Sequence, residues 1–165
     1  MTDDLTDFER NILENLDEHG WFCTSVFDPD GNEPSFCYSV GFSRTLGCSE
    51  FIMFGLHPEL MHSMIWEIFR QIKDGRPVKD DALWSGLLEG YDCALRAVHS
   101  TNIVPDWFSS AIWFWSQVQQ RSEPLSAMQI VWPGSTSGKF PWEADCSQDV
   151  RDAQIPLWLP NRGLH

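Results

Sequence analysis

Apolar residues recur at helical spacing in three stretches of the chain. The first stretch opens with Thr6 and Glu9, which match a capping box, and closes at Gly20, a residue suited to a left-handed helix end. The second, Pro58–Lys73, begins with a proline at the first helical position and carries a broad apolar face. The third begins at Pro105 and runs to about Gln119. We therefore expect three helices.

Between these stretches lie runs in which aromatic and β-branched residues dominate or apolar residues alternate with small or polar ones, as is typical of strands. The expected strands are Trp21–Phe27, Phe36–Phe42, Glu50–Leu56, Tyr91–Val98 and Met128–Trp132. The alternation in Phe36–Phe42 predicts a half-buried strand, and the nearly continuous apolar run in Glu50–Leu56 predicts a central one. Asp28–Asn32 has turn chemistry, so the first two strands should pair as a hairpin.

The order of these elements is helix, hairpin, strand, helix, strands, helix, strand, which is not strict βαβα alternation. It favours an α+β fold with a mainly antiparallel sheet and about three helices packed on it. We expect a single domain over residues 1–165, with a core over about 6–132. The segment 133–165 is rich in Pro, Gly and Ser yet holds several aromatic residues, so it should form an ordered wrap over that core.

The net charge of the chain excludes two classes of binding function. The 165 residues include 11 Lys and Arg against 24 Asp and Glu, a net charge of −13. A chain this acidic lacks the clustered cations that bind nucleic acid or anionic membranes.

No apolar run is long enough to span a bilayer, and the start of the chain is acidic where a signal peptide would be basic. Five cysteines without a CxxC pair indicate free thiols in a reducing compartment. We expect a cytoplasmic protein.

The sequence contains no recognisable catalytic or phosphate-binding motif. The sequence has no GxGxxG, P-loop, GxSxG or HExxH pattern. His57 and His62 are five residues apart, whereas a metal-binding pair on one helical face needs a spacing of four. A helix cap and a helix-surface histidine explain them better, and we predict no metal site and no cofactor.

The cysteines allow two kinds of chemistry. A hairpin folded about Asp30 would place Cys23 opposite Cys37, where two thiols could cross-link or bind a soft metal. Two small buried apolar side chains are the favoured interpretation. Cys48 lies near Arg44 in sequence, and a neighbouring guanidinium could lower the pKa of its thiol and make it reactive. No histidine partner can be placed beside it from the sequence, so we do not expect nucleophilic catalysis.

Two segments could form a binding site. Tyr38, Arg44 and Cys48 follow one strand to its exit and could wall a pocket, unless they are an ordinary connection. Two Trp- and Pro-bearing patches, starting at Gln129 and Gly138, lie nine residues apart and could supply binding anchors, or else plug the sheet with their indoles. The candidate residues for a binding surface or pocket are Trp21, Tyr38, Arg44, Cys48, Gln129, Trp132 and Trp142.

Four runs resemble one bacterial family, domain of unknown function 4262. They are HGW at 19–21, FCYSVGF at 36–42, LGCSEFIMFGL at 46–56 and MQIVWPGSTSGKFPWE at 128–143. The resemblance extends from about Asn11 to Leu157 and implies a bacterial, cytoplasmic origin rather than an activity. Cys48-Ser49 stands where the family commonly has His-Pro, and Gly134 where it has Asp, which weakens an enzymatic interpretation.

A topological resemblance to flavin-binding split barrels is weaker. Arg44 is the one nearby cation for a flavin phosphate, so flavin is not predicted. We expect a non-enzymatic interaction or accessory protein that binds a basic protein partner, in an immunity- or antitoxin-like role. The alternative is a small-molecule or flavin-type cofactor-binding enzyme with its pocket at the Tyr38–Cys48 strand and loop. Oligomeric state cannot be inferred from the sequence.

Overall fold

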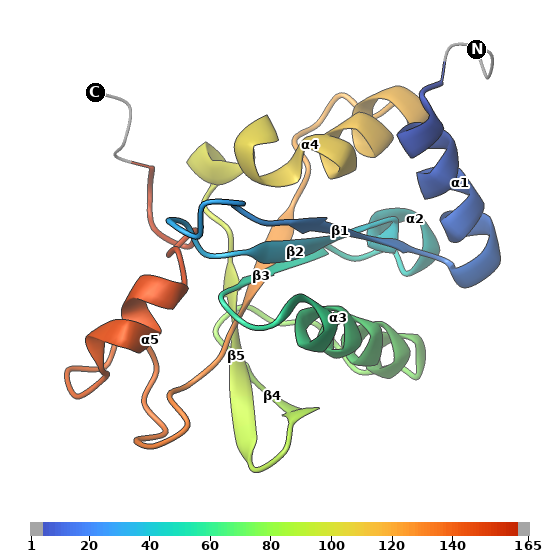
Figure 1. The fold of residues 1–165 in the computed structure, drawn as a ribbon. Coiled ribbons are helices and arrows are strands. Elements are labelled where there is room, and N and C mark those ends of the chain that lie inside the picture. Colours follow the sequence, from blue (N-terminus) through green and yellow to red (C-terminus); the bar gives the residue numbers. More distant parts are fainter. Residues whose placement is uncertain (1–4, 162–165) are drawn as a thin grey trace.

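The computed structural model describes residues 5–161. Their strands form one six-stranded sheet in the order β1-β2-β3-β6-β5-β4 (Figure 1). The elements are, in chain order, α1 (Asp7–His19), β1 (Phe22–Val26), β2 (Phe36–Val40), α2 (Phe42–Thr45), β3 (Glu50–Phe54), α3 (Pro58–Lys73), β4 (Leu83–Leu88), β5 (Tyr91–Ala97), α4 (Pro105–Trp113), β6 (Ala127–Val131) and α5 (Gln148–Ala153). A 3₁₀ turn, Ser100–Asn102, precedes α4, and a π-helical turn, Phe114–Val118, follows it.

The sheet is mixed, so the expectation of a mainly antiparallel sheet is wrong. Its central pair, β3 and β6, runs parallel, with Glu50 opposite Ala127. The chain leaves β3, builds α3, the β4–β5 hairpin and α4, and then returns to lie beside β3 in the same direction. The fold is α+β, but residues 5–161 hold five α-helices rather than about three. The two additional helices, α2 and α5, have four and six residues, too few to show a helical period.

Helices cover both faces of the sheet. α3 packs on one face, and α1 and α4 pack on the other (Figure 1). Every residue of β2 is therefore buried, and the prediction that this strand is half-buried is wrong. Cys37 faces the core under α3, whereas its neighbour Tyr38 faces the core under α1 and α4. The side chains of β2 therefore alternate between two buried cores, one on each face of the sheet, and not between a core and solvent.

The predicted helix ends are confirmed. Thr6 Oγ1 accepts the N–H of Glu9 at 3.1 Å, and the Glu9 carboxylate accepts the N–H of Thr6 at 3.0 Å. Gly20 ends α1 with a φ of 90°. His57 caps α3 by accepting the N–H of Glu59 at its Nδ1 atom. The third predicted helix divides into α4 and the π-helical turn that follows it.

The hairpin register differs from the predicted one by two positions. Cys23 lies opposite Ser39, and Ser25 lies opposite Cys37, so the two cysteines are diagonal neighbours rather than direct partners. The cause is the turn, which is centred on Gly31 instead of Asp30. The carboxylate of Asp28 accepts three backbone N–H groups within this turn, from residues 30, 32 and 33, and so holds a wide loop.

Side chains of the core bind the segment that follows β6. The Gln129 amide donates to the carbonyl of Ile155 at 2.8 Å and accepts the N–H of Leu157 at 3.0 Å. Trp132 and Gln154 are joined by two further hydrogen bonds, at 3.0 and 2.9 Å. The C-terminal segment thus follows a fixed path across the end of the sheet. None of the helices within residues 5–161 is long and apolar enough to cross a membrane.

Candidate functional site

An open groove runs between the β1–β2 turn, the start of α4 and the C-terminal segment. Its central part, about 260 Å³, is bounded by Phe27, Pro34, Trp107 and Ile155, with Asp28 and Glu33 at its border. A second part of about 360 Å³ shares Trp107 and Ile155. A third, about 370 Å³, shares Glu33 and Pro34 and reaches α5. We call these three adjoining hollows, which share lining residues, the acidic groove.

The apolar side chains that border the acidic groove are accessible to solvent. Phe27 is 67% exposed, Leu159 51% and Val26 39%, and these three side chains lie at its borders. Trp107 is half-buried and packs against Phe36 with its ring centroid 5.4 Å away, which fixes the indole as a wall. Such a patch of exposed aromatic and aliphatic surface, bordered by polar groups, is typical of a site that binds another protein.

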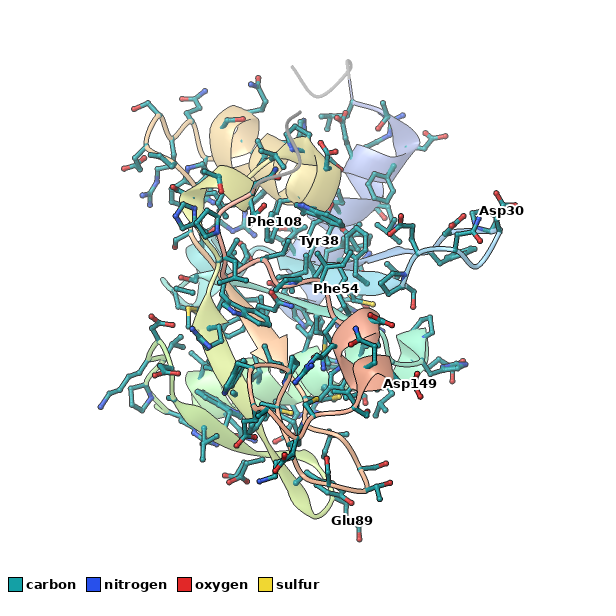
Figure 2. All side chains as sticks on the ribbon, turned by 90° about the vertical axis from the view of Figure 1, so that its left-hand side faces the viewer. Asp30, Tyr38, Phe54, Glu89, Phe108 and Asp149 are labelled. Carbon is teal, nitrogen blue, oxygen red and sulfur yellow. The ribbon has the colours of Figure 1, made fainter. Side chains whose placement is uncertain are left out.

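The rim of the groove carries negative charge alone. Its five acidic residues are Asp28, Glu33, Asp106, Asp149 and Asp152. Lys, Arg and His are absent from the described residues that line it, and none of the five carboxylates lies within 4.0 Å of a described cationic nitrogen. Figure 2 shows the tip of the β1–β2 turn at Asp30 above α5 at Asp149, with the β4–β5 turn at Glu89 below them. A cation in the groove would meet no competing positive charge among these residues.

A second polar feature is a buried carboxylate. Glu50 accepts Ser39 Oγ at 2.7 Å, the N–H of Gly41 at 3.0 Å, the N–H of Phe42 at 3.1 Å, and both the N–H and Oγ of Ser43, at 3.2 and 3.1 Å. Burial raises the pKa of Glu50, and the hydrogen bonds from Ser39 and the three amides oppose that rise. With all its acceptor positions occupied inside the protein, this carboxylate fixes the connection from β2 into α2.

The Tyr38, Arg44 and Cys48 candidates do not gather around a hollow. Tyr38 is buried, and its hydroxyl lies 2.7 Å from Ser110 Oγ in the core under α4. The Arg44 guanidinium lies over the ring of Phe114, on the opposite side of the sheet from Cys48, which packs against the core under α3. Burial and then the charge of Glu50 raise the pKa of Cys48 to about 12, so the expected lowering by Arg44 is wrong in direction.

Trp21 and Cys23 border a smaller pocket of about 180 Å³ on the α3 side, together with His19, His62 and Trp66. Trp21 is 3% exposed and lies edge-on to His62, with ring centroids 5.5 Å apart. Within residues 5–161, no group of three or more His, Cys, Asp or Glu is arranged to hold a metal ion. The neighbouring Cys23 thiol lowers the pKa of Cys37, and Cys37 in turn raises the pKa of Cys23.

The late candidates lie in two places. Gln129 is buried and Trp132 half-buried. Both bind the C-terminal segment, Gln129 at Ile155 and Trp132 at Gln154, and the indole N–H of Trp132 also donates to the carbonyl of Phe54 at 2.7 Å. Trp142 is 42% exposed at a different place, stacked on Phe140 with the Arg96 guanidinium 4.7 Å from its ring centroid. Their roles in binding stay predictions.

Residues 15–147 match the family described as Domain of unknown function (DUF4262). The chain belongs to this family. Comparison with curated proteins and with solved structures gives no match. The runs that carry the DUF4262 resemblance converge on structural contacts: Gly41 with Glu50, and Gln129 and Trp132 with the C-terminal segment. The match therefore identifies the chain without indicating a reaction or a ligand.

The residues of the acidic groove were not among the sequence candidates. Its apolar members come from the ends of β1, α4 and the C-terminal segment, which are distant in sequence. One signal was available: Phe27 is followed by Asp28, Asp30 and Glu33 without an intervening cation. A turn with this composition exposes an aromatic side chain beside several carboxylates.

Proposed function

We propose that the chain is a non-enzymatic interaction protein that binds a basic segment of a partner protein in the acidic groove. The observation that carries the proposal is the pairing of exposed apolar side chains with five carboxylates, none of which lies within 4.0 Å of a described cationic nitrogen. A partner side chain would bury apolar surface on Phe27 and Trp107, and its cations would lie against the rim. An immunity- or antitoxin-like role stays a prediction.

A matched pair of triple variants tests the proposal. Glu33→Gln, Asp149→Asn and Asp152→Asn remove three charges at the groove, and Glu14→Gln, Asp74→Asn and Glu89→Gln remove three exposed charges elsewhere. The probe is a fluorescein-labelled peptide, Lys-Lys-Val-Thr-Val-Thr-Val-Lys-Lys, with its binding followed by anisotropy.

We expect the groove variant to bind the peptide at least tenfold more weakly than the wild type, and the control variant to bind within threefold. Each exposed ion pair contributes about 0.2–1 kcal/mol. Three pairs near the upper end of this range exceed the ~1.4 kcal/mol that a tenfold change in affinity requires. Equal loss in both variants would show that net charge alone attracts the peptide and would overturn the assignment of the groove. Peptide that does not bind the wild type would overturn the proposed function.

A further inference from the structure

The two edge strands of the sheet, β4 and β1, differ in how well they are protected from pairing with a further strand. At β4, the register with β5 shifts between Trp84 and Leu88, and Gly86 has a φ of 89°. The side chains of Arg76 and Gln71 both donate to the carbonyl of Ser85, at 3.1 and 3.4 Å. An irregular edge whose backbone is already hydrogen-bonded to side chains does not accept another strand readily.

β1, the other edge, lacks this protection. Its five residues, Phe22–Val26, pair with β2 in unbroken register and include no charge, proline or bulge. Apart from the ladder with β2, no backbone N–H or C=O of this strand has a hydrogen-bond partner among the described residues. Alternate residues of an antiparallel edge strand direct these groups away from the sheet. Figure 1 shows β1 as the outermost strand, between α4 above and α3 below.

Hollows flank this edge on both faces of the sheet. On the α3 side lies the 180 Å³ pocket bordered by Trp21, Cys23 and Trp66. On the other side, a hollow of about 200 Å³ is bordered by Phe8 and Ser110, and these residues contact the side chains of β1 directly. Side chains of an added strand would alternate between the two faces and so reach both hollows.

The acidic residues near β1 favour a basic partner segment over a second copy of this chain. The strand leads into the turn that carries Asp28, Asp30 and Glu33. At its other end it follows Asp17 and Glu18 of α1, which lie 4.0 Å from Arg44 and 3.8 Å from His19. Two copies paired antiparallel along β1 would bring these acidic groups together, each copy having a net charge of −13. A basic extended segment would instead meet opposite charge at the turn, where Asp28, Asp30 and Glu33 have no cationic nitrogen within 4.0 Å among the described residues.

We propose that the partner's basic segment adds a strand to the outer edge of β1, with its apolar side chains in the two flanking hollows and its cations toward the acidic groove. The proposal rests on the proposed function and names its binding mode. Backbone hydrogen bonds would supply affinity, while alternate side chains and flanking cations would supply specificity.

N-methylation of the probe peptide tests the binding mode without altering the protein. Methyl groups on the three Val nitrogens block one edge of the extended peptide, methyl groups on the two Thr nitrogens block the other, and methylation of all five blocks both. Because the peptide can turn over, one free edge is sufficient for pairing. We expect the fully methylated peptide to bind at least tenfold more weakly than the better of the two single-edge peptides. A smaller difference would overturn strand addition.

The triple groove variant distinguishes failure of strand addition from failure of the proposed function. It should weaken all four peptides by similar factors and leave the ratio between the methylated peptides unchanged. Binding that depends on the groove charges but tolerates full methylation would retain the basic-partner proposal and overturn strand addition.

Hydrogen exchange locates the contact. On binding of the unmodified peptide, outward amides within Phe22–Val26 should exchange at least tenfold more slowly, while amides within Leu83–Leu88 keep their rates. Protection elsewhere, or a free chain that sediments as a dimer with those β1 amides already protected, would overturn the proposal.

Discussion

The backbone N–H of Gly41 donates a 3.0 Å hydrogen bond to Oε2 of Glu50. Gly41 has a φ of 106°, and a side chain on it would press against Leu16. The absence of that side chain allows the chain to turn tightly out of β2 and aim three successive amides at the carboxylate. This contact connects β3 to α2 and brings α1 close to both.

Glu50→Gln should destabilise the fold by about 2–3 kcal/mol, because every group facing the carboxylate is a donor and the new amide NH₂ must oppose at least one of them. Urea unfolding measures the change. Glu14→Gln, at an exposed position of α1, should stay within about 0.5 kcal/mol of the wild type. Equal stability of the two variants would show that the buried carboxylate contributes nothing to the fold.

Gly55→Ala tests how closely α5 approaches the sheet. Gly55 has a φ of 84°, and a Cβ atom there would collide with the carbonyl of Ala153. Gly31→Ala is the matched control, since Gly31 has a φ of 72° but open space around it. We expect a loss of about 1–2 kcal/mol for the Gly31 variant from backbone strain. The Gly55 variant should lose a further ~1–3 kcal/mol from the collision, with faster proteolysis between residues 133 and 161.

Gln129→Met should release the C-terminal segment. The substitution leaves the carbonyl of Ile155 and the N–H of Leu157 without their side-chain partners, at a cost of about 2–4 kcal/mol. Hydrogen exchange should accelerate at Leu157. Gln148→Met, which removes one exposed contact with Asp152, should leave both stability and exchange unchanged. Unaltered exchange at Leu157 in the Gln129 variant would contradict the assigned role.

Cys48 should react slowly with iodoacetamide in the folded protein at pH 8. A pKa raised from 9.0 to about 12 lowers the thiolate fraction roughly 1000-fold. Peptide mapping before and after urea unfolding measures the difference. The sequence-based hypothesis of activation by Arg44 makes a contrary prediction, namely that Arg44→Ala slows the reaction. We expect this variant to react at the wild-type rate.

The sequence was sufficient wherever the determinants are local. Thr6 with Glu9 and His57 with Pro58 specify helix starts through contacts spanning a few residues, and both were located correctly. The hairpin itself was also correct, but its register was not. The position of Cys23 relative to Cys37 depends on how Asp28 organises the turn, and three side-chain-to-backbone bonds in a wide loop leave no pattern in residue type.

Features of the fold that depend on contacts between distant segments were not predicted from the sequence. Nothing in the residues of β3 or β6 shows that they pair in parallel, because both strands are mostly apolar and buried on each face, so either direction would satisfy the pattern. β4 was missed because its register shift and Gly86 interrupt the alternation. The candidate aromatic residues were identified without their partners, so a structural indole such as Trp132 could not be distinguished from an exposed one such as Trp142.

The parallel pairing of β3 with β6 has a consequence for synthesis on the ribosome. β1, β2, β3, α1 and α2 can assemble early, but their sheet ends at an unpaired β3 until residues 127–131 emerge. Residues 55–126 must be translated in the interval, so a half-sheet with an apolar open edge persists for several seconds. That nascent intermediate is the species most exposed to misassembly, and slowing translation within residues 55–126 should lower the yield of native chain.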